Sequence, residues 1–311
     1  MKTITGLFLF FLFTGFIAGG QQVADKISFS QKGFIENKGQ VRDQHGKAND
    51  KVRFIYAEGL FNLQLKSNGF SYELFEIVNS EGGTPESGVQ QKDNDGLTFL
   101  NDDHTFMRSH RIDVKLAGAN AAPELVADRI TEASFNFYTA GLQESGITNV
   151  HGYNRVTYRN IYPEIDLVFS APDAADESSL KYEWILHPGA DPSKIKLQYS
   201  GATALVPAAG GGFQLMTSTG TIDESNVIAY LQDDQTPVDA AYRFDGKNVS
   251  YNIIPVKNKT IVIDPNIVWS TYYGGNAGED IQNGEMNVDK QGKPLITGST
   301  ASTQYIASAG A

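Results

Sequence analysis

Two carboxylates inside strand-forming stretches are the residues most able to do chemistry in this sequence. Asp166 lies within EIDLVFS, and Glu183 lies within LKYEWIL. A carboxylate among apolar residues can have a raised pKa and act as a general acid or base. Two of them roughly 5–10 Å apart could hydrolyse a polysaccharide. We favour the alternative that Asp166 pairs with a cation such as Arg155 or Arg159, because buried charges are normally paired.

Other residue types that carry chemistry show no pattern typical of a site. The histidines follow no metal-binding spacing and form no HExxH pair. The sequence has no G-x-S-x-G elbow, no S-x-x-K motif and no phosphate-binding loop. We therefore expect no catalytic residue, no cofactor and no metal site. The five histidines are His45, His104, His110, His151 and His187.

Two acidic segments are weak candidates for cation binding. The stretch QKDNDG at residues 91–96, followed by Asp102, is similar to a calcium loop. Gln91 replaces the first carboxylate, and Asp102 is shorter than the usual glutamate, so we favour an Asx-rich turn. For Glu279 and Asp280, which follow a glycine, we likewise favour a solvated turn over a cation site.

The composition excludes several classes of protein. The chain has 25 Lys and Arg against 36 Asp and Glu, so most of its surface would repel a nucleic acid. It has no cysteine, which excludes disulfides and a lipid-modified N-terminal cysteine. Its 311 residues, 41% of them hydrophobic, are enough to build a large core without covalent cross-links.

The first 20 residues have the pattern of a cleaved secretory signal. One cation, Lys2, precedes an apolar run from about Leu7 to Ile17, and small residues follow before Gln21. The run is too short to span a bilayer, and no basic stop-transfer flank follows it. We expect an exported protein whose mature chain begins near Gln21, and a retained anchor is the weaker alternative. No later segment is apolar enough to span a membrane.

Strand signals dominate from about residue 30 to residue 263. In FNLQLKSNGFSYEL the apolar residues alternate on both sides of Asn68-Gly69, which predicts a β-hairpin with positive φ angles at that pair. The stretches RIDVKL, LKYEWIL and KIKLQY alternate in the same way, and no window has a convincing helical stripe. The pattern predicts an all-β, sandwich-like domain over residues 21–266.

Beyond residue 266 the pattern changes to short strands separated by glycines. The segment contains STYYGG, Gly278, Val288-Asp289, Gly292 and LITG, and it resembles a bacterial β-propeller repeat of the SBBP type. Pro294 departs from the usual repeat, at the first position of a strand, where proline is tolerated. The resemblance implies that residues 267–311 form the first blade. A single blade cannot bury both of its faces, so we expect further blades in the same chain and predict that this chain is a fragment.

The preceding domain resembles DUF7948, a domain of unknown function that precedes such repeats in secreted bacterial proteins. The resemblance rests on FIENKGQ, VRF, VKL, YRNIYPEIDLVF, PGADP and VIDP. It departs from the pattern at Glu164, where glycine is expected, and at His151-Gly152, where proline is usual. It implies an exported surface protein of gliding Gram-negative bacteria, and no catalytic residues come with the family.

The most consistent hypothesis is an exported, non-catalytic interaction or adhesion protein, secreted or at the cell surface, whose N-terminal domain caps a β-propeller. Its partner would be a surface glycan or a protein, bound through loops, because recognition concentrates in loops on a rigid scaffold. Two alternatives remain: a secreted polysaccharide hydrolase that uses Asp166 and Glu183, and a purely structural stalk element.

Overall fold

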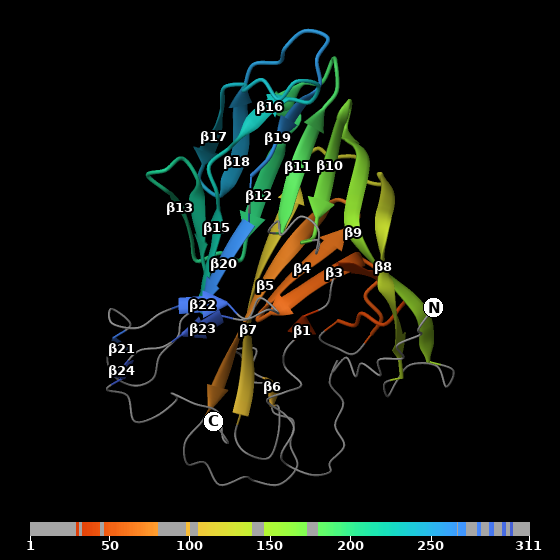
Figure 1. The fold of residues 1–311 in the computed structure, drawn as a ribbon, viewed down its shortest axis with the longest axis vertical. Helices are drawn as coiled ribbons and strands as arrows, with labels where there is room; N and C mark the ends of the chain where they lie inside the picture. The colour runs from red at the N-terminus through yellow and green to blue at the C-terminus, as the bar shows by residue number, and fades with distance from the viewer. Residues whose placement is uncertain are drawn as a thin grey trace.

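A computed structural model gives the fold of the chain (Figure 1). It describes residues 29–30, 33–43, 47–79, 98–99, 105–138, 146–172, 180–265, 267–271, 279–280, 286–288, 294–296 and 299–300. The fold is all-β, as predicted. Within the described ranges the helical structure consists of one short 3-10 helix, η2 (Pro192–Lys194), capped by the side chain of Asp191.

Most of the strands join one large, strongly curved antiparallel sheet. Its path is β16-β19-β11-β10-β9-β2-β3-β4-β5-β7-β12-β18-β17, with β1, β6 and β8 paired to single members of that path. The bounds are β1 (Phe29–Ser30), β2 (Phe34–Glu36), β3 (Val52–Gly59), β4 (Phe61–Lys66), β5 (Gly69–Asn79), β6 (Thr98–Phe99), β7 (Thr105–Leu116), β8 (Glu124–Phe137), β9 (Ile147–Tyr162), β10 (Ile165–Ser170), β11 (Lys181–Leu186), β12 (Lys196–Ser200), β16 (Ala229–Leu231), β17 (Ala240–Asp245), β18 (Asn248–Ile253) and β19 (Ile261–Ile263).

The predicted hairpin is present as β4 and β5, but its turn lies one residue earlier than expected. Lys66 pairs with Gly69, so Ser67 and Asn68 form the turn. Neither Asn68 nor Gly69 has a positive φ, which corrects the prediction for that pair. Gly69 is required for a different reason, because a Cβ there would lie 2.4 Å from the carbonyl oxygen of Val114 on β7.

A second, four-stranded antiparallel sheet packs against the large one. Its order is β13-β14-β15-β20, and its last strand comes from beyond the predicted domain boundary at residue 266. Five residues of β20 pair in register with β15, from Ile267 opposite Glu224 to Thr271 opposite Gly220. The strand that begins the predicted blade is thus part of the small sheet. The bounds are β13 (Ala204–Pro207), β14 (Phe213–Met216), β15 (Gly220–Glu224) and β20 (Ile267–Thr271).

One core fills the space between the two sheets. The inward residues of the large sheet include Tyr72, Trp184 and Leu197, and those of the small sheet include Phe213 and Ile222. All five belong to one continuous cluster of buried side chains. The large sheet also packs against itself, since Phe70 on β5 contacts Phe169 on β10, and the two sheets together form a sandwich-like fold around this shared core.

The C-terminal repeat-like segment contains two short strand pairs. β22 (Met286–Val288) pairs with β23 (Pro294–Ile296), and Pro294 is the first residue of its strand. β21 (Glu279–Asp280) pairs with β24 (Ser299–Thr300), so Glu279 and Asp280 form a short strand and not the turn favoured from the sequence. The predicted signal segment and the calcium-like stretch 91–96 with Asp102 lie outside the described residues.

Candidate functional site

Asp166 is buried on β10 and is fully engaged in polar contacts. Its Oδ1 accepts a hydrogen bond from the backbone N–H of Asn160 (2.7 Å). Its Oδ2 lies 2.6 Å from the Arg159 guanidinium and 3.1 Å from Nε2 of His187. Burial acts to raise the pKa of Asp166, but the bonds from Asn160, His187 and Arg159 outweigh it and hold the pKa below its ordinary value. This is the paired arrangement that the sequence favours.

These contacts stabilise the turn between β9 and β10. Glu164, in the turn, has a left-handed φ of 59°, and Asn160, with a φ of 45°, lies in β9 where its register with β10 shifts. The carbonyl oxygen of Glu164 accepts a hydrogen bond from the backbone N–H of His187 (2.9 Å). Asp166 therefore connects the turn to the end of β11.

Glu183 lies on the neighbouring strand but belongs to a different ion pair. It stands opposite Val168, whereas Asp166 stands opposite Ile185. Nζ of Lys181 lies 3.4 Å from the Glu183 carboxylate and 3.2 Å from the carboxylate of Asp264. Separate ion pairs are typical of structural carboxylates. The geometry gives no support to Asp166 and Glu183 as an acid/base pair.

The motif FIENKGQ also has a structural role. The Asn37 side chain donates hydrogen bonds to the carbonyl oxygens of Asn49 (3.0 Å) and Val52 (2.7 Å). The Glu36 carboxylate accepts a bond from the backbone N–H of His151 (2.8 Å). The motif thus bonds β2 and the turn after it to the start of β3 and to β9, the two strands that flank β2.

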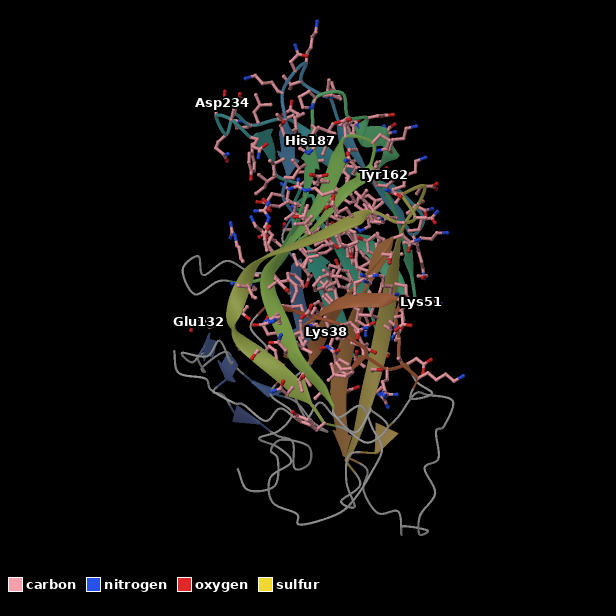
Figure 2. The ribbon with its side chains drawn as sticks, turned by 90° about the vertical axis from the view of Figure 1, so that its right-hand side faces the viewer. Lys38, Lys51, Glu132, Tyr162, His187 and Asp234 are labelled. Atoms are coloured by element: carbon pink, nitrogen blue, oxygen red, sulfur yellow. The ribbon has the colours of Figure 1, made fainter. Side chains whose placement is uncertain are left out.

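The three histidines within the described residues have different partners. His187 contacts Asp166, His110 contacts the side chain of Ser218, and His151 supplies its backbone N–H to Glu36. In Figure 2, Lys38 of the FIENKGQ motif lies far below His187. This motif and the contact between His187 and Asp166 are therefore in different parts of the molecule. His45 and His104 are not among the described residues. Within that described part, no three potential metal-ligand side chains come together.

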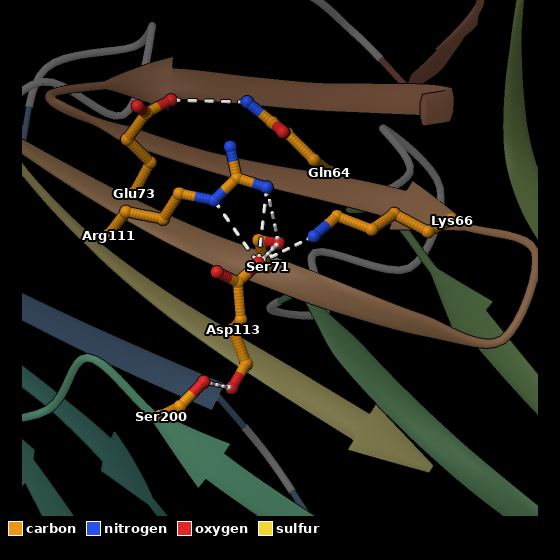
Figure 3. Close-up of polar contacts among 7 residues, drawn as sticks. All are labelled: Gln64, Lys66, Ser71, Glu73, Arg111, Asp113 and Ser200. Carbon is orange, nitrogen blue, oxygen red and sulfur yellow. Dashed lines mark hydrogen bonds and ion pairs between the residues drawn. The ribbon is translucent and has the colours of Figure 1, made fainter. Parts of the chain in front are cut away.

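A charged network covers part of the outer face of β4, β5 and β7 (Figure 3). Asp113 is its centre and accepts hydrogen bonds from Lys66 (2.5 Å), Ser71 (2.6 Å) and Arg111 (3.1 Å). Burial opposes ionisation of Asp113, but these donors outweigh it and lower its pKa to about 2. Lys66 reaches Asp113 from β4, across β5, and Arg111 lies on the same strand as Asp113, so opposite charges compensate one another on this face of the sheet.

The most unusual polar group is Glu224, the last residue of β15. Its carboxylate is buried between the two sheets and accepts hydrogen bonds from three tyrosine hydroxyls. Tyr72 on β5 (2.9 Å) and Tyr199 on β12 (3.3 Å) donate to Oε1, and Tyr182 on β11 (2.7 Å) donates to Oε2. The Tyr182 hydroxyl also lies 3.3 Å from that of Tyr251. One side chain of the small sheet is thus bonded to three strands of the large one.

The electrostatics of Glu224 follow from this surrounding. Burial raises the pKa of its carboxyl to about 7, and the bonds from Tyr182, Tyr72 and Tyr199 limit that rise. The groups that donate hydrogen bonds to the carboxylate are neutral tyrosine hydroxyls. Burial also raises the pKa of each of the three tyrosines, and the neighbouring Glu224 adds to the effect. The cluster can exchange a single proton near neutral pH.

Sequence reasoning did not identify Glu224 and selected Asp166 instead. A weak signal was present, because in GTIDE the alternation places Glu224 on the same face as Gly220 and Ile222, and all three are buried. The tyrosines that surround it come from strands far away in the sequence. Their convergence depends on the long-range pairing of the sheets, which a local pattern does not contain.

The cluster lies at the junction where β20 joins the domain. Ile267 is the cross-strand neighbour of Glu224 and belongs to the common core, with 4% of its surface exposed. Its backbone N–H points to the carbonyl oxygen of Leu180 (3.4 Å) and away from β15. Because N–H directions alternate along an antiparallel strand, Val268 directs its N–H toward Asp223 of β15.

Comparisons with known proteins identify one family. Residues 34–266 match the family described as "Domain of unknown function (DUF7948)". No curated protein and no solved structure matches the chain. No helix in the described part of the chain is long and apolar enough to cross a membrane. The family match extends from β2 to the residue before β20 and covers most of the 311 residues. The chain therefore belongs to the DUF7948 family.

Proposed function

We propose that this protein is an exported, non-catalytic interaction module, secreted or at the cell surface, in which the N-terminal domain holds a propeller-type repeat. One observation supports the proposal: β20, the first strand of the repeat-like segment, pairs in the small sheet beyond one end of β19, and exposed loops lie at the other end. Three residues separate β19 from β20, and β20 is paired in the small sheet. In Figure 1 the connection from β18 to β19 lies at the top, and β20 runs downward, away from it.

The loops at the end of β19 that lies away from β20 surround an open hollow. It has a volume of about 350 Å³, and its wall consists of the segment after β16 and the segment before β19. Ile254 and Val256, which precede β19 in the same connection, are exposed, Ile254 to 81%. We propose these exposed loops as the recognition surface, because binding concentrates in loops on a rigid scaffold. The lining residues are Gln232, Asp233, Asn258, Lys259 and Thr260.

The assignment to an exported protein rests on the signal-like N-terminus and on the resemblance of residues 267–311 to an SBBP repeat. Both family motifs that the structure describes in detail, FIENKGQ and YRNIYPEIDLVF, supply hydrogen bonds that stabilise the fold. Such a rigid scaffold suits a protein that binds through its loops. Further blades after this segment are part of the proposal.

A glycan array probed with the full chain tests the proposal, because it separates a binding module from a structural stalk. We expect binding that the variant Ile254→Ser weakens about tenfold, since an exposed apolar anchor at an interface contributes on that scale. The matched control is Ile228→Ser, an equally apolar side chain, 55% exposed, near Asp264 at the other end of β19. Absence of binding, or equal loss in both variants, would contradict the proposed role of these loops.

A further inference from the structure

Two strand ends meet at the buried Glu224 carboxylate. β15 ends at Glu224, and β20 begins at its cross-strand neighbour Ile267. Strand ends open more easily than strand centres, because fewer hydrogen bonds hold them. A change of charge at this position therefore acts where the attachment of β20 is easiest to release.

The hydrogen bonds can satisfy Glu224 in both protonation states. The ionised carboxylate accepts from Tyr72, Tyr182 and Tyr199. When the carboxyl is protonated, its O–H can donate to the Tyr182 oxygen, because the Tyr182 hydroxyl can then donate to Tyr251, 3.3 Å away. Nε1 of Trp184 also donates to the Tyr251 oxygen (3.0 Å), which fixes that hydroxyl in place.

Protonation removes the buried charge, but it also takes the Tyr182 oxygen away as an acceptor for the Tyr251 hydroxyl. The titratable groups that face Glu224 are tyrosines from five strands of the large sheet, and they bring it no positive charge. The ionised form is thus a buried charge held by neutral donors, which is costly compared with a solvated carboxylate. These tyrosines are Tyr72 on β5, Tyr182 on β11, Tyr199 on β12, Tyr242 on β17 and Tyr251 on β18.

We propose that Glu224 and its tyrosines form a proton-binding site that controls how firmly β20, and with it the repeat, is attached to the domain. This inference rests on the proposed function, because it concerns the strand that holds the repeat. With the proton bound, the Glu224–Ile267 end of the small sheet stays closed on the core. When the proton leaves, the charge favours opening of this end, where the carboxylate reaches water.

The direction of the pH dependence follows from the pKa of Glu224. Its pKa is about 7 in the closed state and the ordinary 4.5 when solvated. Because the pKa is higher in the closed state, proton binding stabilises the closed state fully below pH 4.5, and this stabilisation is lost as the pH rises through 7. Between pH 6 and pH 8 the closed state of β20 should therefore weaken about tenfold relative to the open state.

Hydrogen–deuterium exchange of the full chain tests the inference. The readout is the protection factor of the amides of residues 267–271 at pH 6 and pH 8, after correction for the intrinsic exchange rate. We expect about a tenfold fall in the wild type, no fall in Glu224→Gln, and a wild-type fall in the control Asp223→Asn, which changes the adjacent carboxylate. Val268→Pro, which removes the N–H directed to β15, defines the unprotected level.

The outcomes separate this inference from the proposed function. If the amides of β20 stay equally protected at both pH values, the proton-binding site is wrong, while the attachment of β20 stands. If they are as unprotected as in Val268→Pro at both pH values, the attachment itself fails. Should Glu224→Gln not fold, Tyr199→Phe replaces it: loss of a donor to the carboxylate should move the fall to higher pH, and an unchanged midpoint would overturn the inference.

Discussion

At the scale of single residues, Asp166 is the clearest case of a carboxylate used for stability. We expect Asp166→Asn to lower the free energy of unfolding by about 1–3 kcal/mol at pH 7, because the amide cannot pair with Arg159 or accept equally from all three donors. Arg159→Gln should cost about 1 kcal/mol or less, since the side chain of Arg159 is half exposed. Urea unfolding followed by tryptophan fluorescence measures both.

The pH dependence of Asp166→Asn provides the control. The pKa of Asp166 lies below the ordinary 3.8, so its stabilising contribution is complete above 3.8 and is lost as the pH falls through its native pKa. The difference between wild type and variant should therefore narrow in strong acid. A difference that stays constant from pH 7 into strong acid would mean that the contacts of the charged carboxylate are not its source.

Residue types and local pattern predicted the role of Asp166 but not that of Glu224. A carboxylate in an apolar strand, with Arg159 nearby in the sequence, is sufficient to predict an ion pair. Glu224 depends on Tyr72 and Tyr182, which are distant in sequence, and tyrosine in an all-β chain is normally read as strand packing. Its environment becomes visible only when the two sheets are placed face to face.

At the scale of the strands, glycines determine where neighbours can approach. Gly201 follows β12 with a φ of 95°, and a Cβ there would lie 2.2 Å from the carbonyl oxygen of Arg111 on β7. Gly118 has a similar φ of 73° but open space around it. We expect Gly118→Ala to cost about 1 kcal/mol, from backbone conformation alone, and Gly201→Ala about 3 kcal/mol, because β7 and β12 must also separate. Thermal unfolding compares the two, and equal costs would show that the close approach contributes nothing.

Strand positions were predictable where apolar residues alternate, and turn geometry was less so. The alternation in FNLQLK and FSYEL identified both strands of the β4–β5 hairpin, because one of their faces is buried. The sequence pair Asn68-Gly69 suggested a turn that the chain places one residue earlier. Gly69 is needed for its proximity to Val114, a contact between strands that are separate in the sequence.

At the scale of the whole molecule, strand order depends on pairings between distant segments. β2 pairs with β3 and β9, and β7 pairs with β5 and β12. Alternation fixes which face of each strand is buried, but it is equally compatible with many orders of strands in a sheet. For this reason the fold class was predictable, whereas the crossing of the chain from β19 in one sheet to β20 in the other was not.

That crossing gives a prediction about the extent of the folding unit. A chain of residues 21–273 should be at least about 2 kcal/mol more stable than one of residues 21–266, because Ile267 is buried in the shared core. Denaturant unfolding measures the difference. In the longer chain Val268→Pro should remove most of the gain, since it deletes a backbone bond to β15 and leaves Ile267 in place. Equal stability of the two chains would mean that β20 adds nothing to the stability of a domain that is already complete at residue 266. A clear difference would place β20 inside the cooperative unit, so that any force on the segment after β20 acts directly on the core around Glu224.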